Sequence, residues 1–173
     1  MPRIMTIIFP MISLKKKLFC QGIFIATIVA FLDLLSKRLV FAILEQQASN
    51  NPEIKIFDFF SLVHVWNRGV SFGMFNYLQN SHIIFSLLQG SIALVLAVWL
   101  YRVEHKHFAY SLGLIIGGAM GNVVDRIRNG AVADFLDFHI GTYHWPAFNL
   151  ADSCVFIGVM ILIFDEMFFK KKS

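Results

Sequence analysis

Long apolar runs alternate with short polar segments along most of the chain. Four of these runs, at about 18–35, 83–101, 108–124 and 151–169, are nearly free of charged residues in their interiors. A helix needs roughly 20 apolar residues to cross ~30 Å of hydrocarbon, and each run is close to that length. The pattern therefore predicts an all-α membrane core of four transmembrane helices, which form one domain over residues 18–169.

A shorter apolar stretch, from Ile4 to Leu14, precedes these four runs and is interrupted by Pro10. It is too short to span a bilayer, and Ser13-Leu14-Lys15 does not provide the small-residue cleavage site of a secretory signal peptide. Residues 1–17 are therefore interpreted as a cytoplasmic extension. Translation could start at any of the three methionines of this region, which are Met1, Met5 and Met11.

The two longer connections, at about 45–80 and 127–149, have features of β-structure. Residues 54–58 and 61–66 are rich in β-branched and aromatic side chains that partly alternate with polar ones. The segment from His139 to Trp145 has turn residues at its centre and predicts a hairpin. We expect a small β-rich platform at one end of the helices, although the pairing of its strands cannot be read from the sequence.

Composition supports a membrane location. Hydrophobic residues make up 57% of the chain and charged residues 15%, and the mean hydropathy is +0.66, whereas a soluble domain carries about 25% charged residues. These values exclude a disordered or collagen-like chain and a basic nucleic-acid-binding surface, and they argue against a soluble enzyme.

The basic residues predict the orientation of the helices. Nine of the 15 Lys and Arg residues lie before the first run, between the second and third, or after the fourth. An even number of crossings places these three segments on one side, and the positive-inside rule makes that side cytoplasmic. Both termini, including the basic tail 170–173, are then cytoplasmic, and the β-rich platform faces outward.

Cysteine and histidine give little support for other chemistry. Cys20 and Cys154 lie far apart inside apolar runs and are interpreted as buried structural thiols. The pairs His105/His107 and His139/His144 lack a third ligand at metal spacing, so no zinc site is expected. The chain also lacks an HExxH motif, a GxSxG nucleophile elbow and a Cys–His arrangement.

Several polar or glycine-rich clusters converge on the outer level, and each has a structural interpretation. Asp33 and Lys37 can pair one turn apart, and Asp125 can pair with Arg126. Asn149 and Asp152 have the spacing of a capping box at the start of the fourth helix. Glycines at 113, 117, 118 and 121 would let the third helix approach a neighbour closely.

Two outer-facing carboxylates, those of Asp134 and Asp152, have a further interpretation. If folding brings them together, repulsion and desolvation would keep a proton on one of them. An aspartic protease uses that arrangement: the ionised carboxylate activates water, and the protonated one polarises the scissile carbonyl. Their spacing alone does not establish the pair, and Asp125 is a rival to Asp134 by position.

Five motifs together resemble the lipoprotein (type II) signal peptidases of bacteria. They are Asp33-Leu-Leu-Ser36-Lys37, Asn67-Arg-Gly-Val-Ser-Phe-Gly73, the segment 117–126 ending in Asn122-Val-Val-Asp125-Arg126, Val132-Ala-Asp134-Phe135, and Pro146-Ala-Phe-Asn149-Leu-Ala-Asp152-Ser153. They occur in order over about residues 18–169. Ser36 stands where Thr is expected, and Val70-Ser71 stands where paired alanines are common.

The resemblance implies an aspartyl endopeptidase of the bacterial inner membrane whose catalytic dyad is Asp134 and Asp152. It implies that Asn67, Asn122, Arg126 and Asn149 line the site, that Asp33 supports it, and that no metal or organic cofactor is needed. The implied substrate is a prolipoprotein with a diacylglyceryl cysteine, cleaved on the amino side of that cysteine, and the implied inhibitor is globomycin. The other expected partner is membrane lipid, and the protein is expected to be monomeric. Phe72, Phe135 and Trp145 are candidates for apolar substrate contacts.

Two other classes of membrane protein could carry acidic residues of this kind. A transporter or channel subunit would spread its acids through the bilayer, but Asp134 and Asp152 are both placed at one face. A presenilin-type protease carries a Gly-x-Gly-Asp motif, which this chain lacks. Both alternatives have weaker support in the sequence.

Overall fold

The structure, a computed structural model, describes residues 2–47, 52–69 and 81–168, with side chains from residue 14 onward. Its helices are α1 (Pro2–Leu44), α2 (Ser81–Leu100), α3 (Lys106–Asn129) and α4 (Leu150–Phe168). The prediction that all four apolar runs are helical is confirmed. The ends of α2 and α4 lie within two residues of the predicted ones, whereas α3 continues five residues past Val124.

Helix α1 is much longer than the predicted 18–35 segment, because it runs without interruption from Pro2 to Leu44. Residues 2–17, which were predicted to form a cytoplasmic extension, are helical and continuous with the first apolar run. The predicted end at residue 35 is wrong, because the charged residues Asp33 and Lys37 do not end the helix. Instead they pair within it, with Nζ of Lys37 2.7 Å from Oδ2 of Asp33.

Within the part of the chain that the structure describes, three helices are long and apolar enough to cross a membrane: residues Leu14–Leu44 of α1, all of α2 and all of α3. Helix α4 has 19 residues and carries Asp152 in its first turn and Asp165 and Glu166 near its end. Large apolar side chains are exposed on the outer faces of α2 and α4, such as Leu87, Leu94 and Phe156. Such surfaces suit lipid better than water.

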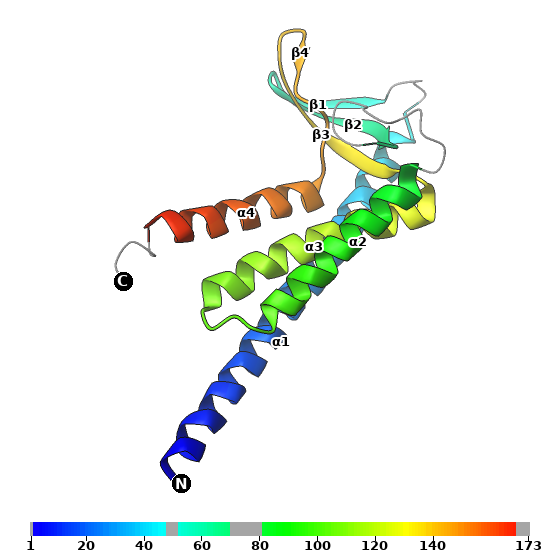
Figure 1. Cartoon of the computed structure of the whole chain (residues 1–173). Coiled ribbons are helices and arrows are strands. Elements are labelled where there is room, and N and C mark those ends of the chain that lie inside the picture. The colour runs from blue at the N-terminus through cyan, green and yellow to red at the C-terminus, as the bar shows by residue number, and fades with distance from the viewer. Residues whose placement is uncertain (1, 48–51, 70–80, 169–173) are drawn as a thin grey trace.

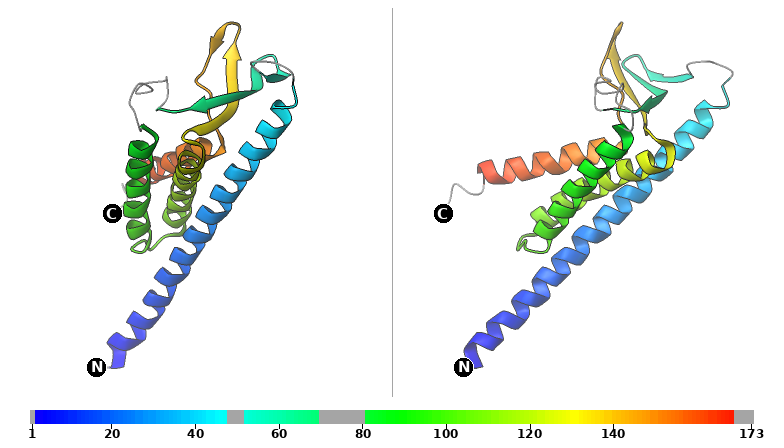
Figure 2. Two further views of the ribbon diagram at one scale, coloured as in Figure 1. Left: turned by 90° about the vertical axis from the view of Figure 1, so that its right-hand side faces the viewer. Right: turned by 45° about the vertical axis from the view of Figure 1, so that its right-hand side comes forward.

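Helix α3 lies at the centre and contacts α1, α2 and α4; Figure 2 shows α4 leaving the bundle at an angle to the other three. Its glycines allow this packing. A Cβ at Gly117 would lie 2.5 Å from the carbonyl oxygen of Ala26 in α1, and a Cβ at Gly118 would clash with the carbonyl of Ala151 in α4. The predicted close approach of the third helix is confirmed on two sides.

The two longer connections form one antiparallel sheet in the order β1-β2-β3-β4. The strands are β1 (Glu53–Phe57), β2 (Phe60–Asn67), β3 (Val132–Ile140) and β4 (Tyr143–His144). The predicted platform and the hairpin are confirmed, with Gly141 at the turn in a left-handed conformation (φ 61°). Strand β3 begins earlier than expected, because its apolar first half lacks the alternation that marks a half-exposed strand.

The sheet lies at one end of the bundle, where α1 and α3 end and α2 and α4 begin (Figure 1). Helix α3 ends at Gly130, whose φ of 68° turns the chain into β3. Leu136 then pairs with Phe148 just ahead of α4. This path brings the start of β3 next to the first turn of α4, and so places Asp134 close to Asp152.

Candidate active site

Asp134 is a buried carboxylate on β3. Its side chain accepts hydrogen bonds from Nδ2 of Asn67 at 3.0 Å and from Nδ2 of Asn149 at 2.6 Å. Asn67 reaches it because Asn67 ends β2, whose residue Val65 pairs with Asp134 across the sheet. Both bonds come from asparagines on other elements, so the position of Asp134 is fixed by the tertiary fold.

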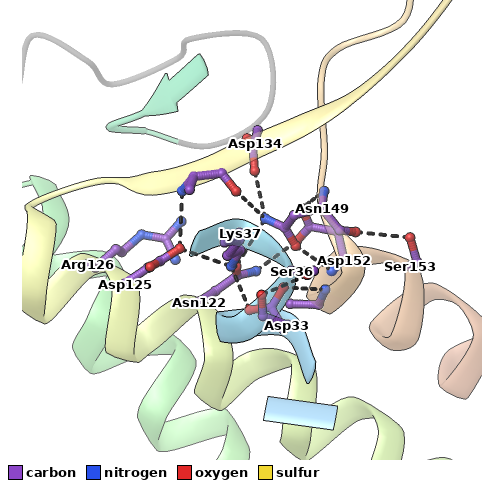
Figure 3. A network of polar contacts seen from close by, with 12 residues as sticks. Asp33, Ser36, Lys37, Asn122, Asp125, Arg126, Asp134, Asn149, Asp152 and Ser153 are labelled. Carbon is purple, nitrogen blue, oxygen red and sulfur yellow. Dashed lines mark hydrogen bonds and ion pairs between the residues drawn. The ribbon is translucent and has the colours of Figure 1, made fainter. Parts of the chain in front are cut away.

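Asp152 lies in the first turn of α4 and takes part in the predicted capping box. The backbone N–H of Asp152 donates to Oδ1 of Asn149 at 2.9 Å, and the backbone N–H of Asn149 donates to Oδ2 of Asp152 at 3.3 Å. The other carboxylate oxygen accepts from Nδ2 of Asn122 on α3 at 2.8 Å. Asn149 therefore bonds to both aspartates: its amide nitrogen to Asp134, and its amide oxygen to the backbone of Asp152 (Figure 3).

The two carboxylates influence each other. Burial raises the pKa of the Asp134 carboxyl to about 7, and the neighbouring charge of Asp152 acts in the same direction. The hydrogen bonds from Asn67 and Asn149 partly offset this rise in pKa, because they stabilise the ionised form of Asp134. Asp134 is thus suited to hold a proton near neutral pH.

A buried ion cluster lies directly beneath the pair. The ammonium of Lys37 lies 2.7 Å from Asp33, 3.0 Å from Asp125 and 2.9 Å from the amide oxygen of Asn122. The predicted pair of Lys37 with Asp33 is confirmed. The contacts of Lys37 with α3 were missed because they join residues 85 or more positions apart in the sequence.

The two acids of this cluster hold the backbone next to each candidate catalytic residue. Asp33 accepts the backbone N–H of Ala151 at 2.9 Å, and Asp125 accepts the backbone N–H of Ala133 at 3.1 Å. Ala151 and Ala133 directly precede Asp152 and Asp134. Asp33 and Asp125 therefore position the pair through the main chain.

The predicted ion pair between Asp125 and Arg126 is wrong. Asp125 pairs with Lys37, and the Arg126 guanidinium instead donates to Oε1 of Gln89 at 2.7 Å and to the carbonyl of Gly69 at 3.4 Å. Consecutive residues on a helix point about 100° apart, so each finds a different partner. The positive charge of Arg126 acts on Asp152 and Asp134. Gln89 was not predicted to be a site residue. Its signal in the sequence is that it is a lone side-chain amide inside the second apolar run.

A cavity of about 790 Å³ lies in front of these groups. Its polar wall contains Asp134 and Asp152 together with Asn67, Asn122 and Arg126. Its apolar wall includes Trp145, Phe148 and Phe156. All the predicted polar site residues except Asn149 and Asp33 line the cavity. Asn149 donates a hydrogen bond to the lining residue Asp134, and Asp33 accepts one from the backbone of Ala151, next to the lining residue Asp152.

The other predictions for individual residues have mixed outcomes. Trp145 lines the cavity, whereas Phe135 packs in a buried cluster with Phe41 and Ala133. Phe72 and the segment Val70–Gly73 lie outside the described residues. Cys20 is exposed and not buried as expected, and Cys154 is half-buried. The conclusion that His139 and His144 lack a third possible ligand is wrong, because Asp137 lies beside them.

Comparison with known proteins shows the family of the chain. The family model described as signal peptidase (SPase) II matches residues 25–168. A lipoprotein signal peptidase of Anaplasma marginale (strain Florida) is 41% identical over 152 residues, which cover 88% of this chain and 87% of that protein. One from Francisella tularensis subsp. novicida (strain U112) is 42% identical over 153 residues, covering 86% and 92%.

The fold is also found among solved structures. A bacterial membrane enzyme solved by the in meso method has a TM-score of 0.71 and 26% identity, and the alignment covers 86% of this chain and 94% of that one. Since the family model covers all four helices except the first half of α1, the chain belongs to the signal peptidase II family.

Proposed function

We propose that this protein removes signal peptides from prolipoproteins whose cysteine carries a diacylglyceryl group, cleaving on the amino side of that cysteine. Asp134 and Asp152 are the catalytic pair, and water is the nucleophile. The observation that carries the proposal is the position of two buried carboxylates, bridged by Asn149, on the polar wall of a cavity whose other wall is apolar. The family to which the chain belongs supports the same activity.

The surroundings of the two acids favour different roles. Asp134 has a raised pKa and holds the shared proton, which it donates to the carbonyl oxygen of the scissile bond. Asp152 accepts its shortest hydrogen bond from Asn122, and the nearby positive charge of Arg126 favours an ionised carboxylate. Asp152 is therefore the ionised member. It takes a proton from water as the water oxygen attacks the carbonyl carbon, and it gives that proton to the nitrogen of the leaving amine as the C–N bond breaks. In the same step one hydroxyl of the tetrahedral diol returns a proton to Asp134, which restores the pair.

The remaining polar groups are positioning residues. Asn67 and Asn149 orient Asp134, and Asn122 orients Asp152. Asp33 acts one step further away, through the backbone of Ala151. This chemistry requires no metal or organic cofactor, because the two carboxylates supply both proton transfers.

The apolar wall of the cavity suits the lipid part of the substrate. Val155, Phe156 and Val159 on α4 continue the cavity away from the aspartates. Acyl chains lying along this wall would remain in the hydrocarbon layer, while the peptide bond next to the modified cysteine reaches the polar wall. Trp145 also lines the cavity, and tryptophan is common at membrane–water interfaces.

The membrane arrangement follows from the same placement. We infer that α4 is a fourth transmembrane helix, that the sheet faces the periplasm, and that both termini are cytoplasmic in the bacterial inner membrane. The sheet and the aspartates lie at the end of the bundle away from Lys15 and Arg102, as the positive-inside rule requires. The protein acts as a monomer with a single catalytic domain, because one chain supplies all the groups that the chemistry needs.

Gel-shift cleavage of a diacylglyceryl prolipoprotein by the purified protein in detergent tests the proposal. Asp134→Asn and Asp152→Asn should each abolish cleavage while the protein remains folded, and globomycin should inhibit the unaltered protein. Asp125→Asn should retain part of the activity. Asp165→Asn, on the same helix as Asp152 but beside His107 at its other end, serves as the matched control with full activity. Cleavage by either catalytic variant at the unaltered rate would contradict the dyad.

A further inference from the structure

A second cluster of ionisable side chains lies on the β3–β4 hairpin, outside the catalytic cavity. Nδ1 of His144 lies 2.8 Å from Oδ2 of Asp137, and Nδ1 of His139 lies 3.2 Å from the same oxygen. One donor atom from each of the three residues lies within 4.8 Å of the other two. The proposed peptidase reaction uses none of these groups.

The sheet itself brings the three residues together. Asp137 and His139 are two positions apart on β3, so they lie on the same face of the strand, whereas Asp134 lies on the other face. His139 is the direct partner of His144 on β4, and their rings stack with centroids 4.8 Å apart. The cluster is therefore built on paired strands, and its spacing does not depend on a loop.

The burial of the cluster leaves its polar atoms poorly satisfied. The side chain of Asp137 is 7% exposed and that of His139 is 10% exposed. Nδ1 of His139 is buried and has no hydrogen-bond partner in the described part of the chain, although it faces Asp137. The hydroxyl of Ser61, the residue that pairs with Asp137 across the sheet, donates to Glu53 instead. A buried ring nitrogen without a hydrogen-bond partner costs free energy, and a bound cation would remove that cost.

The donor atoms have the spacing of metal ligands. Zn²⁺ binds histidine nitrogens at about 2.0–2.1 Å and carboxylate oxygens at about 2.0–2.2 Å in tetrahedral geometry, which places neighbouring ligand atoms about 3.3 Å apart. The two nitrogen–oxygen distances of 2.8 and 3.2 Å need little adjustment to meet this value. His144 is half exposed, so water could enter and take a fourth position. Imidazole ligands favour zinc-like ions over magnesium or calcium.

We propose that Asp137, His139 and His144 bind one zinc-like divalent cation, which fastens the two-residue strand β4 to β3. Trp145 directly follows His144, and its backbone N–H donates to the carbonyl of Phe138 at 2.8 Å. Because Trp145 lines the catalytic cavity, the ion would fix the hairpin that carries part of the apolar wall. The site does not depend on the proposed peptidase activity.

Calorimetric titration of Zn²⁺ into the chelator-treated, detergent-purified full chain tests this site, with Co²⁺ absorption as a second readout. We expect one ion per chain, a rise in Tm on zinc addition, and the visible absorption of a Co²⁺ ion with nitrogen and oxygen ligands. His144→Ala should weaken binding at least about tenfold, since even changes next to a ligand cost that much. His139→Ala and Asp137→Asn should also weaken it.

The second stacked histidine pair supplies the matched control. His105 and His107 have ring centroids 5.4 Å apart at the other end of the bundle, so His105→Ala should bind zinc like the unaltered protein. Because His144 is half exposed, His144→Ala should stay folded, which circular dichroism can verify. Absence of stoichiometric binding, or equal affinity in His144→Ala and the unaltered protein, would overturn the proposal. Neither result would bear on cleavage of prolipoproteins, which is measured separately.

Discussion

The side-chain amide of Asn149 donates a 2.6 Å hydrogen bond to Asp134 while its oxygen caps the helix that carries Asp152. One residue thus serves both the stability of α4 and the geometry of the proposed catalytic pair. A helix cap acts within a few residues of the helix start, whereas the bond to Asp134 joins α4 to the sheet. The two roles can be separated by choosing a side chain that performs only one of them.

Asn149→Ser is expected to separate these roles. Serine caps a helix about as well as asparagine, so the variant should keep most of its Tm, but serine is too short to reach Asp134. Asn149→Ala removes the cap as well and should lose about 1 kcal/mol more stability. Both should lower kcat for prolipoprotein cleavage at least roughly tenfold, an ordinary effect for a group that orients a catalytic residue. Full activity in Asn149→Ser would show that its bond to Asp134 does not contribute to catalysis.

The pH dependence of cleavage should report the proton on Asp134. Because its pKa is raised to about 7, kcat/KM should fall as the pH rises through that value and Asp134 loses its proton. Asn67 lowers this pKa through its hydrogen bond, so Asn67→Ala should move the falling limb to higher pH. Asn129→Ala removes an asparagine that bonds to Asp125, and it should leave the limb in place. A limb that stays unmoved in Asn67→Ala would contradict the assignment to Asp134.

The same pKa predicts how stability varies with pH. An Asp whose folded pKa lies above its unfolded value of 3.8 binds its proton more tightly in the native state. Its contribution to stability is therefore complete below about pH 4 and is lost as the pH rises to about 7. Asp134→Asn cannot ionise, so its Tm relative to the unaltered protein should increase between pH 4 and pH 8. The gain is on the order of 1–4 kcal/mol. A Tm difference that does not change with pH would contradict the raised pKa.

Features set by short-range spacing could be predicted from the sequence. The capping box of Asn149 and Asp152 and the Asp33–Lys37 pair each involve residues three or four positions apart on one helix. The apolar runs predicted the helices because bilayer thickness fixes their length. The hairpin at Gly141 was predicted from its turn residues.

Features that depend on tertiary contacts could not be predicted in this way. Lys37 on α1 bonds to Asn122 and Asp125 on α3. Nothing in the local sequence shows that Asp125 pairs with Lys37 and not with the adjacent Arg126. The grouping of Asp134 with Asp152 came from a family resemblance, since the spacing of two acids does not reveal whether a strand and a helix meet. Asp137 lies beside His139 and His144 because β3 is nine residues long and extends past Asp137 to the residues that pair with β4.

Gly117 should tolerate no larger residue. A Cβ there would lie 2.5 Å from the carbonyl oxygen and 2.8 Å from the Cα of Ala26, and the backbone of α1 cannot move aside cheaply. Gly117→Ala is therefore expected to cost about 1–3 kcal/mol, measured as a lower Tm in detergent. Gly90 on α2 has no atom within 4 Å of an added Cβ, so Gly90→Ala should be neutral or stabilising. Equal Tm values for the two variants would show that α1 and α3 can separate without cost.

Lys37 should be required for folding because it is the cation shared by two buried acids. Lys37→Met leaves Asp33 and Asp125 without it and should destabilise the protein by about 3–5 kcal/mol. Adding Asp33→Asn and Asp125→Asn removes the stranded charges, while each amide oxygen can still accept the backbone N–H that its carboxylate held. The triple variant should therefore recover much of the lost Tm. Lys55→Met, at an exposed ion pair with Asp58, is the control and should not change Tm. If Lys37→Met alone kept the Tm of the unaltered protein, the two acids would not depend on this ammonium for their burial.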